Sequence, residues 1–460
     1  MTQRSARPHG SPRGDRVARP GGLQPASSAL LTDHYELTML RAAVADGTVA
    51  RRTVFEVFAR SLPPGRRYGV VAGLGRVLDA VRSFRFTAEQ IAHLVAGDVV
   101  DQPTADYLAD LRFRGDIDGY AEGEAYFANS PVLTVSGTFG ECILLETVVL
   151  SILNHDSAIA SAASRMVVAA AGRGLLEMGT RRTHELAAPA AARAAYIAGF
   201  AATSNLSAGQ LYGVPTRGTA AHAFTLVHPS EKSAFASLVA ALGPGTTLLV
   251  DTYDVPAAIT TAVEVAGRGL GGIRIDSGDL FAQAVAARAQ LDALGATGTR
   301  IVVTGDLDEH AIAALAEAPV DLYGVGTRLV TGSGHPTAGM VYKLVAVSEA
   351  AGADVALRPV AKRSLGKETV GGRKVAVRRL DAGGQAVAEE VVVLLEADEG
   401  QAGPGRSLQV AAMRDGEVVH RPTLEQMRAH HRAVLGELTD EDLDLSPGTP
   451  RLFADPGGDP

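Results

Sequence analysis

The sequence predicts an α/β fold, in which an irregular (β/α) TIM-like barrel is joined to a second, discontinuous α/β domain built from the N- and C-terminal segments. Between residues 136 and 340, short apolar runs that end in polar or glycine residues alternate with helical stretches, which is typical of a parallel sheet. On either side of this region the pattern changes to mixed or antiparallel strands. A chain of 460 residues is also too long for one small core.

Five short apolar runs are the expected barrel strands, and they cover residues 199–205, 247–251, 272–276, 300–306 and 322–327. Helical patterns precede or separate them at residues 141–153, 157–172, 188–196, 256–265, 280–294 and 309–316. So many strand and helix units in roughly 200 residues favour a barrel over an open sheet. In such barrels the site lies at the carboxyl ends of the strands, where polar residues collect in this sequence.

The terminal segments, residues 28–135 and 341–446, are expected to pack together as the discontinuous α/β domain around the barrel region of residues 136–340. The first carries strand and helix patterns, and the second carries runs typical of antiparallel strands before a last helix at 423–435. Residues 1–27 are rich in Arg, Pro, Gly and Ser and are predicted to form a disordered tail. Residues 447–460 are predicted to be a flexible end.

Composition excludes several classes of function. The formal net charge of -8 gives no reason to expect nucleic acid or an acidic membrane as a partner. No apolar run reaches the roughly 18 to 20 residues of a membrane span, and the N-terminal segment lacks the apolar region of a secretory signal. The one cysteine, Cys142, allows neither an internal disulfide nor a cysteine-rich zinc site. We therefore expect a cytoplasmic protein without zinc.

The segment 212–224 is predicted to form a junction between a strand and a helix that presents one imidazole, that of His222. It lies between apolar runs and contains the glycine and proline residues of a turn. A lone histidine in such a place is more often a structural residue that has found a hydrogen-bond partner than a catalytic one. Its role therefore depends on what surrounds it.

Four carboxylates close the predicted barrel strands or follow them directly: Asp251, Asp276, Asp279 and Asp306. Taken singly, each could be the N-cap of the next helix. Converging at one edge they would repel each other, unless a hard cation such as Mg²⁺ or the hydroxyls of a sugar satisfy them. Together they favour a ligand.

Two further motifs suit anionic groups. The glycine-rich turn at 324–327 follows the last predicted barrel strand, a place where backbone N–H groups often bind phosphate. Arg181 and Arg182 offer forked donors for phosphate or carboxylate, although a pair of surface salt bridges would explain them as well. Each motif alone is a weak signal.

In combination these motifs resemble the nicotinate phosphoribosyltransferase family, the ATP-coupled enzymes of pyridine-nucleotide salvage. Their order and spacing carry the resemblance, which extends over roughly residues 28 to 380. The motifs are TDHYELTM at 32–39, MGTRR at 178–182, TSNLSAG at 203–209, GTAAH at 218–222, DTYD at 251–254, IRIDSGD at 273–279 and GVGT at 324–327.

The resemblance implies that phosphoribosyl is transferred from phosphoribosyl pyrophosphate to nicotinate, giving nicotinate mononucleotide and pyrophosphate, with ATP as co-substrate. It implies that ATP phosphorylates His222, which suits the chemistry because a neutral imidazole nitrogen is a competent nucleophile near pH 7. It implies Mg²⁺ as the cofactor, and neither NAD nor a flavin. It also implies a homodimer with the site shared between subunits, because Tyr35 would stack on the pyridine ring of the neighbouring subunit's site.

The resemblance assigns further roles residue by residue. Arg274 would pair with the nicotinate carboxylate and Thr219 would hydrogen-bond nearby. Asp251 and Asp276 would orient the pyrophosphate and its Mg²⁺. The other groups expected at phosphoribosyl pyrophosphate are Arg181 at the phosphates, Gly305 and Asp306 at the ribose, and Gly326 and Thr327 at the 5′-phosphate.

Asn205 bears on the choice of substrate. It stands where related nicotinamide-using enzymes carry an aspartate, and because it is uncharged it would admit the nicotinate carboxylate. Two alternatives stay open at this point, a nicotinamide phosphoribosyltransferase and a non-catalytic barrel that serves as a binding protein. A quinolinate-using relative is disfavoured, because that enzyme lacks the phosphohistidine step and is usually much shorter.

Overall fold

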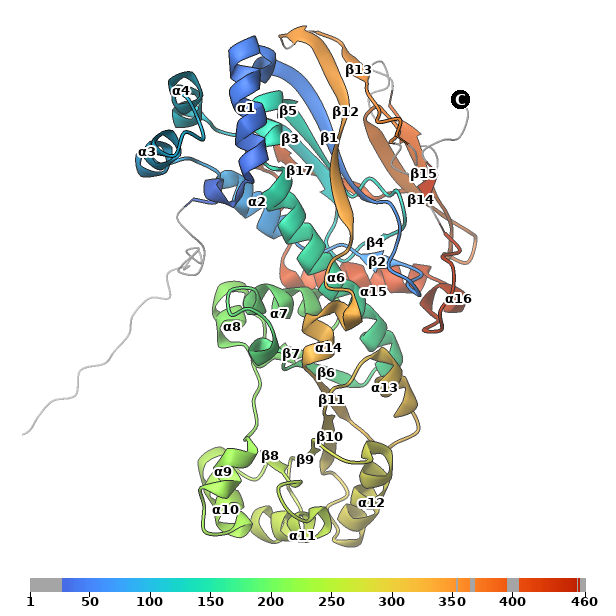
Figure 1. Cartoon of the computed structure of the whole chain (residues 1–460). Helices are drawn as coiled ribbons and strands as arrows, with labels where there is room; N and C mark the ends of the chain where they lie inside the picture. Colours follow the sequence, from blue (N-terminus) through green and yellow to red (C-terminus); the bar gives the residue numbers. More distant parts are fainter. Residues whose placement is uncertain (1–26, 353–354, 365–368, 395–404, 453, 456–460) are drawn as a thin grey trace, which may run out of the picture.

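The computed structural model describes residues 27–352, 355–364, 369–394, 405–452, 454 and 455. Two bodies lie one above the other in Figure 1: an upper one with an antiparallel sheet and a lower one with a parallel sheet. The α-helices are α1 His34–Asp46, α2 Leu74–Arg82, α3 Ala88–Ala96, α4 Gln102–Asp110, α5 Phe139–Ile143, α6 Glu146–Ala170, α7 Ala188–Ile197, α8 Leu206–Tyr212, α9 His222–Leu226, α10 Glu231–Leu242, α11 Val255–Ala266, α12 Leu280–Ala293, α13 Glu309–Ala314, α14 Thr327–Val330, α15 Leu424–Glu437 and α16 Asp440–Leu443. Four short 3-10 helices are η1 Ala29–Leu31, η2 Thr48–Ala50, η3 Thr180–Arg182 and η4 Gly332–Gly334.

The lower body contains a six-stranded parallel sheet in the order β7-β6-β11-β10-β9-β8. Its strands are β6 Gly174–Glu177, β7 Ala202–Thr203, β8 Thr247–Leu249, β9 Gly272–Ile275, β10 Arg300–Thr304 and β11 Leu322–Val325. Five of them coincide with the predicted strand runs, which confirms the parallel α/β architecture. β6 was missed by the sequence analysis.

Closure of this sheet into a complete barrel is not seen among the described residues. β7 and β8 are the two edges of the sheet, which forms a half-barrel. The chain between them folds into α8, α9 and α10, and contributes one isolated parallel bridge, from Thr203 to Thr216. The predicted TIM-like ring is therefore replaced on this side by helices.

The upper body contains a seven-stranded antiparallel sheet in the order β13-β12-β1-β5-β3-β17-β18. These strands are β1 Arg51–Ala59, β3 Asp116–Tyr120, β5 Leu133–Thr138, β12 Met340–Ala351, β13 Leu357–Pro359, β17 Gln409–Arg414 and β18 Glu417–Val418. β1, from the N-terminal segment, lies between β5 and β12, and β3 pairs with β17. Strands from both ends of the chain thus share one sheet.

Two smaller sheets complete the upper body. A four-stranded sheet has the order β16-β14-β15-β19, and β2 pairs with β4. These strands are β2 Gly69–Val70, β4 Ala125–Tyr126, β14 Lys374–Leu380, β15 Ala386–Val393, β16 Arg406–Ser407 and β19 Ala454–Asp455. Residues 1–26 of the predicted tail lie outside the described residues, as do 453 and 456–460 of the predicted flexible end. Leu452 and Ala454 of that end are buried, and β19 pairs with β15.

The long helix α6 runs from the upper body into the lower one (Figure 1). The sequence predicted two helices here, 141–153 and 157–172, and that prediction was wrong, because α6 is continuous over Glu146–Ala170. The polar residues between the two predicted helices are satisfied inside the fold. Asp156 is fully buried and accepts hydrogen bonds from Arg76 Nη1 at 2.8 and 2.9 Å and shares a 2.8 Å contact with His155 Nδ1. The helix can therefore continue over these polar residues without a break.

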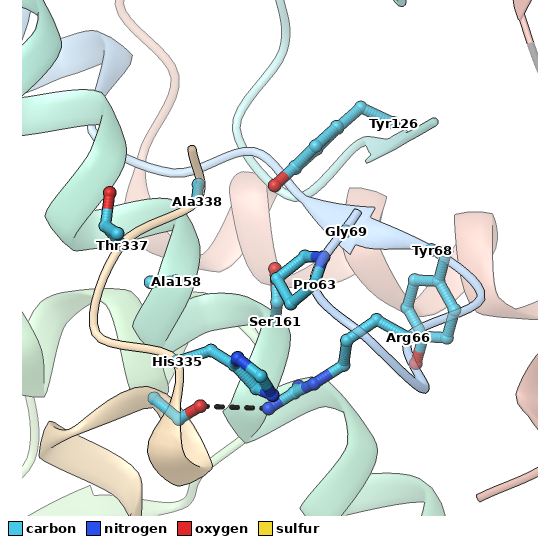
Figure 2. Close-up of a pocket in the computed structure, with 11 residues that line it drawn as sticks. Pro63, Arg66, Tyr68, Gly69, Tyr126, Ala158, Ser161, His335, Thr337 and Ala338 are labelled. Atoms are coloured by element: carbon cyan, nitrogen blue, oxygen red, sulfur yellow. Dashed lines mark hydrogen bonds between the residues drawn. The ribbon is translucent and has the colours of Figure 1, made fainter. Parts of the chain in front are cut away.

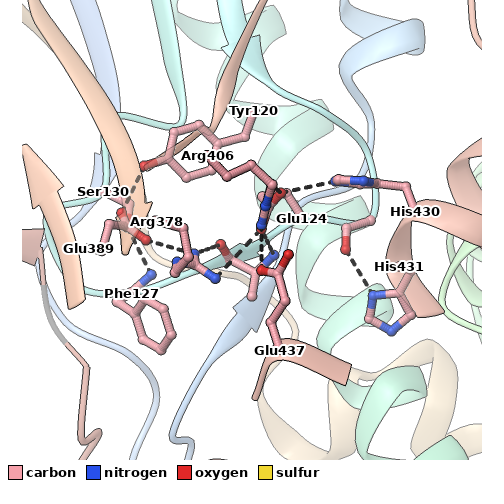
Figure 3. Close-up of polar contacts among 12 residues, drawn as sticks. Tyr120, Glu124, Phe127, Ser130, Arg378, Glu389, Arg406, His430, His431 and Glu437 are labelled. Carbon is pink, nitrogen blue, oxygen red and sulfur yellow. Dashed lines mark hydrogen bonds and ion pairs between the residues drawn. The ribbon is translucent and has the colours of Figure 1, made fainter. Parts of the chain in front are cut away.

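A buried ion network ties the two terminal segments together (Figure 3). The Glu124 carboxylate, before β4, accepts hydrogen bonds from Arg406 Nη1 at 2.6 Å and Nη2 at 3.0 Å, and lies 2.9 Å from His430 Nε2. Arg378, which has no exposed surface, pairs with Glu389 at 2.8 Å. Burial alone would raise the pKa of Glu124, but these hydrogen bonds and cationic charges outweigh it and lower that pKa to about 2. Glu124 is therefore held ionised.

None of the helices in the described part of the chain combines the length and the apolarity that a membrane span requires. The side chain of Cys142 has no exposed surface and lies in the core of the upper body.

Candidate active site

The predicted site residues of the lower body gather at the carboxyl edge of the parallel sheet. Because parallel strands all end at the same edge, residues far apart in the chain meet there. They are Arg181 after β6, Asn205 after β7, Asp251 after β8, Asp276 after β9, Gly305 and Asp306 after β10, and Gly326 and Thr327 after β11.

His222 is the first residue of α9 and faces the loop after β8. Its Nδ1 lies 3.2 Å from Thr252 Oγ1, and its Nε2 lies 3.8 Å from Asp251 Oδ1. The imidazole is 40% exposed, whereas the Asp251 side chain is 3% exposed. One side of the ring is thus held by the protein while the ring remains open to a ligand.

Asp251 and Asp276 follow the neighbouring strands β8 and β9. Asp251 Oδ2 accepts hydrogen bonds from the Asp276 backbone N–H at 2.9 Å and from Ser277 Oγ at 2.8 Å. Its Oδ1 is buried and has no hydrogen-bond partner among the described residues. Thr304 Oγ1 donates to Asp276 Oδ1. The pair is fixed in place, with one acceptor of Asp251 left over for His222 or a cation.

Arg274 projects from the middle of β9 toward the segment that precedes His222. Its Nη1 donates to Thr219 Oγ1 and, at 3.2 Å, to Ala220 O, while its Nε is buried without a partner among the residues described. Burial lowers the pKa of Arg274, the charges of Asp276 and Asp251 oppose that shift, and the like charge of Arg181 adds to it. Arg274 thus lies close enough to Arg181, Asp251 and Asp276 for their charges to act on it.

Asn205 is the N-cap of α8 and its side chain is turned into the protein. Its Oδ1 accepts from the Ala208 N–H at 2.7 Å, and its Nδ2 donates to Thr180 Oγ1 at 3.2 Å. The second bond joins Asn205 to the residue that precedes Arg181. Asp279 is also an N-cap, of α12, where it accepts from the Ala282 N–H at 3.0 Å. For Asp279 the capping alternative was therefore correct.

Glu177 was missed by the sequence analysis. It closes β6, is 1% exposed, and accepts hydrogen bonds from the Gly179 N–H and from Thr203 Oγ1. Thr203 Oγ1 in turn accepts from the Asn205 N–H at 2.9 Å. Burial raises the pKa of Glu177, and the hydrogen bonds from Thr203 and Gly179, which act to lower it, offset this only in part. The available signal was its position, since it is an acidic residue that ends a short apolar run, as Asp251 does.

The turn after β10 requires glycine, and the turn after β11 also contains one. Gly305 has a φ of +120°, and a Cβ there would lie 2.8 Å from Asp276 O. Asp306, with a φ of 33°, is exposed at the same turn. Gly326 precedes Thr327, the first residue of the single turn α14. These turns present backbone at the same edge as His222 and Arg274.

Tyr35 is not brought to this edge. It lies in the first turn of α1, in the upper body, while α9, β8 and β9 lie in the lower body (Figure 1). Its side chain is 43% exposed, and burial of its hydroxyl, with the charges of Glu146 and Glu36, raises its pKa to about 12. Within one chain it cannot stack on a ring held by Arg274.

The described residues hold no group of three or more His, Cys, Asp or Glu side chains that could bind a metal by themselves. A cation at Asp251 and Asp276 would need oxygen ligands from a bound substrate.

The fold and the site define an α/β protein in which arginine, aspartate and histidine side chains gather at the carboxyl edge of a parallel sheet. Residues 30–154 match the profile of the nicotinate phosphoribosyltransferase (NAPRTase) N-terminal domain. The chain is 57% identical over 452 residues to nicotinate phosphoribosyltransferase pncB1 of Mycobacterium tuberculosis, covering 95% of this chain and 96% of that one. It is 37% identical to nicotinate phosphoribosyltransferase of Bacillus subtilis, over 71% and 69% of the two chains. The crystal structure of human nicotinic acid phosphoribosyltransferase superposes with a TM-score of 0.77 at 27% identity, over 92% of this chain and 97% of that one. The chain belongs to the nicotinate phosphoribosyltransferase family.

Proposed function

We propose that this chain transfers the phosphoribosyl group of phosphoribosyl pyrophosphate to nicotinate, in an ATP-coupled reaction of NAD salvage. The observation that carries the proposal is the meeting of Arg274, Thr219 and His222 beside Asp251 and Asp276. The 57% identity to a nicotinate phosphoribosyltransferase supports it over 95% of the chain.

In the transfer step, the pyridine nitrogen of nicotinate forms a bond to the anomeric carbon of the ribose. The bond from that carbon to the pyrophosphate oxygen breaks, and its electron pair leaves with pyrophosphate. Arg274 binds the nicotinate carboxylate through Nε and Nη2, since Nε has no partner among the described residues and Nη1 is held by Thr219 and Ala220. The carboxylate accepts a hydrogen bond from a donor that would otherwise stay unpaired, which is costly in a buried place.

Phosphoribosyl pyrophosphate lies along the strand ends. Arg181 binds its phosphates, Asp306 and the Gly305 backbone bind the ribose hydroxyls, and Gly326 and Thr327 bind the 5′-phosphate at the start of α14. The exposed side chains of Arg181 and Asp306 are open to such a ligand.

The residues fit Mg²⁺, because carboxylates suit a hard cation and Asp251 Oδ1 is a buried acceptor without a partner among the described residues. Asp251 and Asp276 would hold it together with oxygens of the pyrophosphate. When bound, Mg²⁺ offsets the negative charge that collects on the leaving pyrophosphate.

His222 couples ATP hydrolysis to this site. A ring nitrogen attacks the γ-phosphorus of ATP, the bond to the ADP oxygen breaks, and ADP leaves. Water later cleaves the nitrogen–phosphorus bond, which releases phosphate and regenerates the imidazole. Thr252 Oγ1, 3.2 Å from Nδ1, fixes the ring orientation, and Asp251 Oδ1 lies 3.8 Å from Nε2.

The proposed protein is a cytoplasmic homodimer. Tyr35 of one subunit would stack on the pyridine ring in the site of its partner, which accounts for an exposed tyrosine in the upper body, away from its own site.

The choice of base is tested by measuring products with nicotinate and with nicotinamide. The wild type is expected to turn over nicotinate and to use nicotinamide poorly. Asn205→Asp keeps an N-cap for α8 but adds a negative charge. The KM of this variant for nicotinate should rise at least about 10-fold, because like charges a few Å apart in a partly buried site cost more than ~1.4 kcal/mol.

Asn129→Asp, in a turn of the upper body, is the matched control and should leave the KM for nicotinate and the turnover of both bases unchanged. Turnover of nicotinamide alone would replace the proposal by a nicotinamide phosphoribosyltransferase. Turnover of neither base would favour the non-catalytic binding protein.

A further inference from the structure

A second polar site lies away from the strand ends, in a small pocket between the loop before β2, helix α6 and η4 (Figure 2). Arg66, Tyr126, Ser161 and His335 are among the residues that line it. The free space inside is close to what a single water-sized particle needs, which favours a monatomic occupant over a polyatomic one such as phosphate.

The guanidinium of Arg66 reaches this pocket with one donor unused. The side chain is 5% exposed, and its Nη2 donates to Gly332 O at 2.9 Å. Its Nη1 is buried without a hydrogen-bond partner among the described residues. Figure 2 shows the guanidinium beside the His335 ring. An orphaned charged donor of this kind is costly unless something in the pocket accepts from it.

The buried charges around Arg66 do not balance. Arg66 Nη2 lies 3.8 Å from Glu309 Oε1, and Arg165 Nε donates to the same oxygen at 3.0 Å. Two cations therefore share one carboxylate, and all three side chains are at most 5% exposed. Arg165 Nη1 is also buried without a partner in the part of the chain that the structure describes. The buried cluster has a net charge of +1.

The other titratable groups that face the cluster do not supply the missing negative charge. Burial lowers the pKa of His335, and the charge of Arg66 lowers it further, so the ring is neutral at neutral pH. Burial raises the pKa of Tyr68 and of Tyr126, so both phenols are neutral as well. Asp444 interacts with Arg165, but its carboxylate is 49% exposed and pairs with Arg67 at 3.5 Å.

We propose that this pocket binds a monatomic anion of the halide class, held by Nη1 of Arg66. A water molecule could satisfy the donor but not the buried charge. The anion would join the loop before β2 in the upper body to α6, α13 and η4. Because η4 follows α14 after a single residue, the anion would also stabilise α14 and the turn at Gly326 and Thr327 where that helix begins.

The position of the anion is tested in crystals of the full-length wild type soaked in bromide. An anomalous difference peak at the bromine edge is expected in this pocket, within hydrogen-bond distance of Arg66 Nη1. Ordinary density without an anomalous peak would identify a water molecule and overturn the proposal.

Its contribution to stability is tested by thermal unfolding in potassium chloride and in potassium gluconate at equal ionic strength, since gluconate is too large for the pocket. Chloride should raise the Tm of the wild type by on the order of 1–3 °C. Arg82→Gln, which changes an exposed arginine at the end of α2 outside the pocket, should keep this rise, and Arg66→Gln should lose it. An equal rise in all three proteins would contradict the site, and if Arg66→Gln does not fold, the bromide soak of the wild type decides.

Discussion

His222→Ala is expected to abolish labelling of the protein by γ-labelled ATP. Wild-type protein should take up a label that is labile in acid and stable in base, as a phosphoramidate bond is. The variant removes the only imidazole of the described chain that lies beside both Asp251 and Thr252, so the label should fall to background. The protein is incubated with labelled ATP and freed of nucleotide, and the label that stays bound is counted after treatment with acid and with base.

The matched control is His310→Ala, which removes an exposed histidine from α13 and should leave labelling intact. Equal labelling of the wild type and His222→Ala would refute the assignment of the phosphoryl acceptor. His222→Ala should also retain residual transfer of phosphoribosyl to nicotinate, because Arg274 and the groups at the strand ends are unchanged.

Arg274→Lys is expected to raise the KM for nicotinate by roughly 10- to 100-fold, because a hydrogen bond to a charged group contributes about 1.5–3 kcal/mol and lysine cannot reproduce the fork. Labelling by ATP should change much less, since it depends on His222. Initial rates as a function of nicotinate concentration, beside the labelling assay, separate the two effects.

Arg300→Lys on the adjacent strand β10 is the control. Arg300 is exposed and lies at the opposite end of its strand from Thr304, so its replacement should affect neither measurement. An unchanged KM for nicotinate in Arg274→Lys would remove Arg274 from the carboxylate site, whatever the labelling assay shows.

The sequence predicted most of the parallel sheet because each strand is signalled by a short stretch of neighbouring residues. β8 to β11 are short apolar runs followed by polar or glycine residues, and that pattern needs no knowledge of the rest of the fold. β6 was missed because it is only Gly174–Glu177 and directly precedes the MGTRR motif. Helix α6 was split because Asp156 reads as a break until its partner Arg76, on another helix, is known.

The closed barrel could not be decided from the sequence. Ring closure depends on what pairs with β7 and β8, and the intervening chain forms helices whose packing is a tertiary property. The same limit applies to the site. The family resemblance implied that Arg274 and Thr219 meet at nicotinate and that His222 serves the same site. The contact of Arg274 with Thr219, the burial of Asp251 and the hydrogen bonds that Glu177 accepts required the structure.

The account rests on one claim, that this site joins phosphoribosyl to nicotinate and that ATP drives the reaction through His222. The most direct measurement is the steady-state formation of nicotinate mononucleotide from nicotinate and phosphoribosyl pyrophosphate, with and without ATP. The account predicts turnover that ATP raises, with ADP and phosphate released alongside the product, and no increase by ATP in His222→Ala. Absence of nicotinate mononucleotide under both conditions, or an equal rate with and without ATP in the wild type, would contradict it.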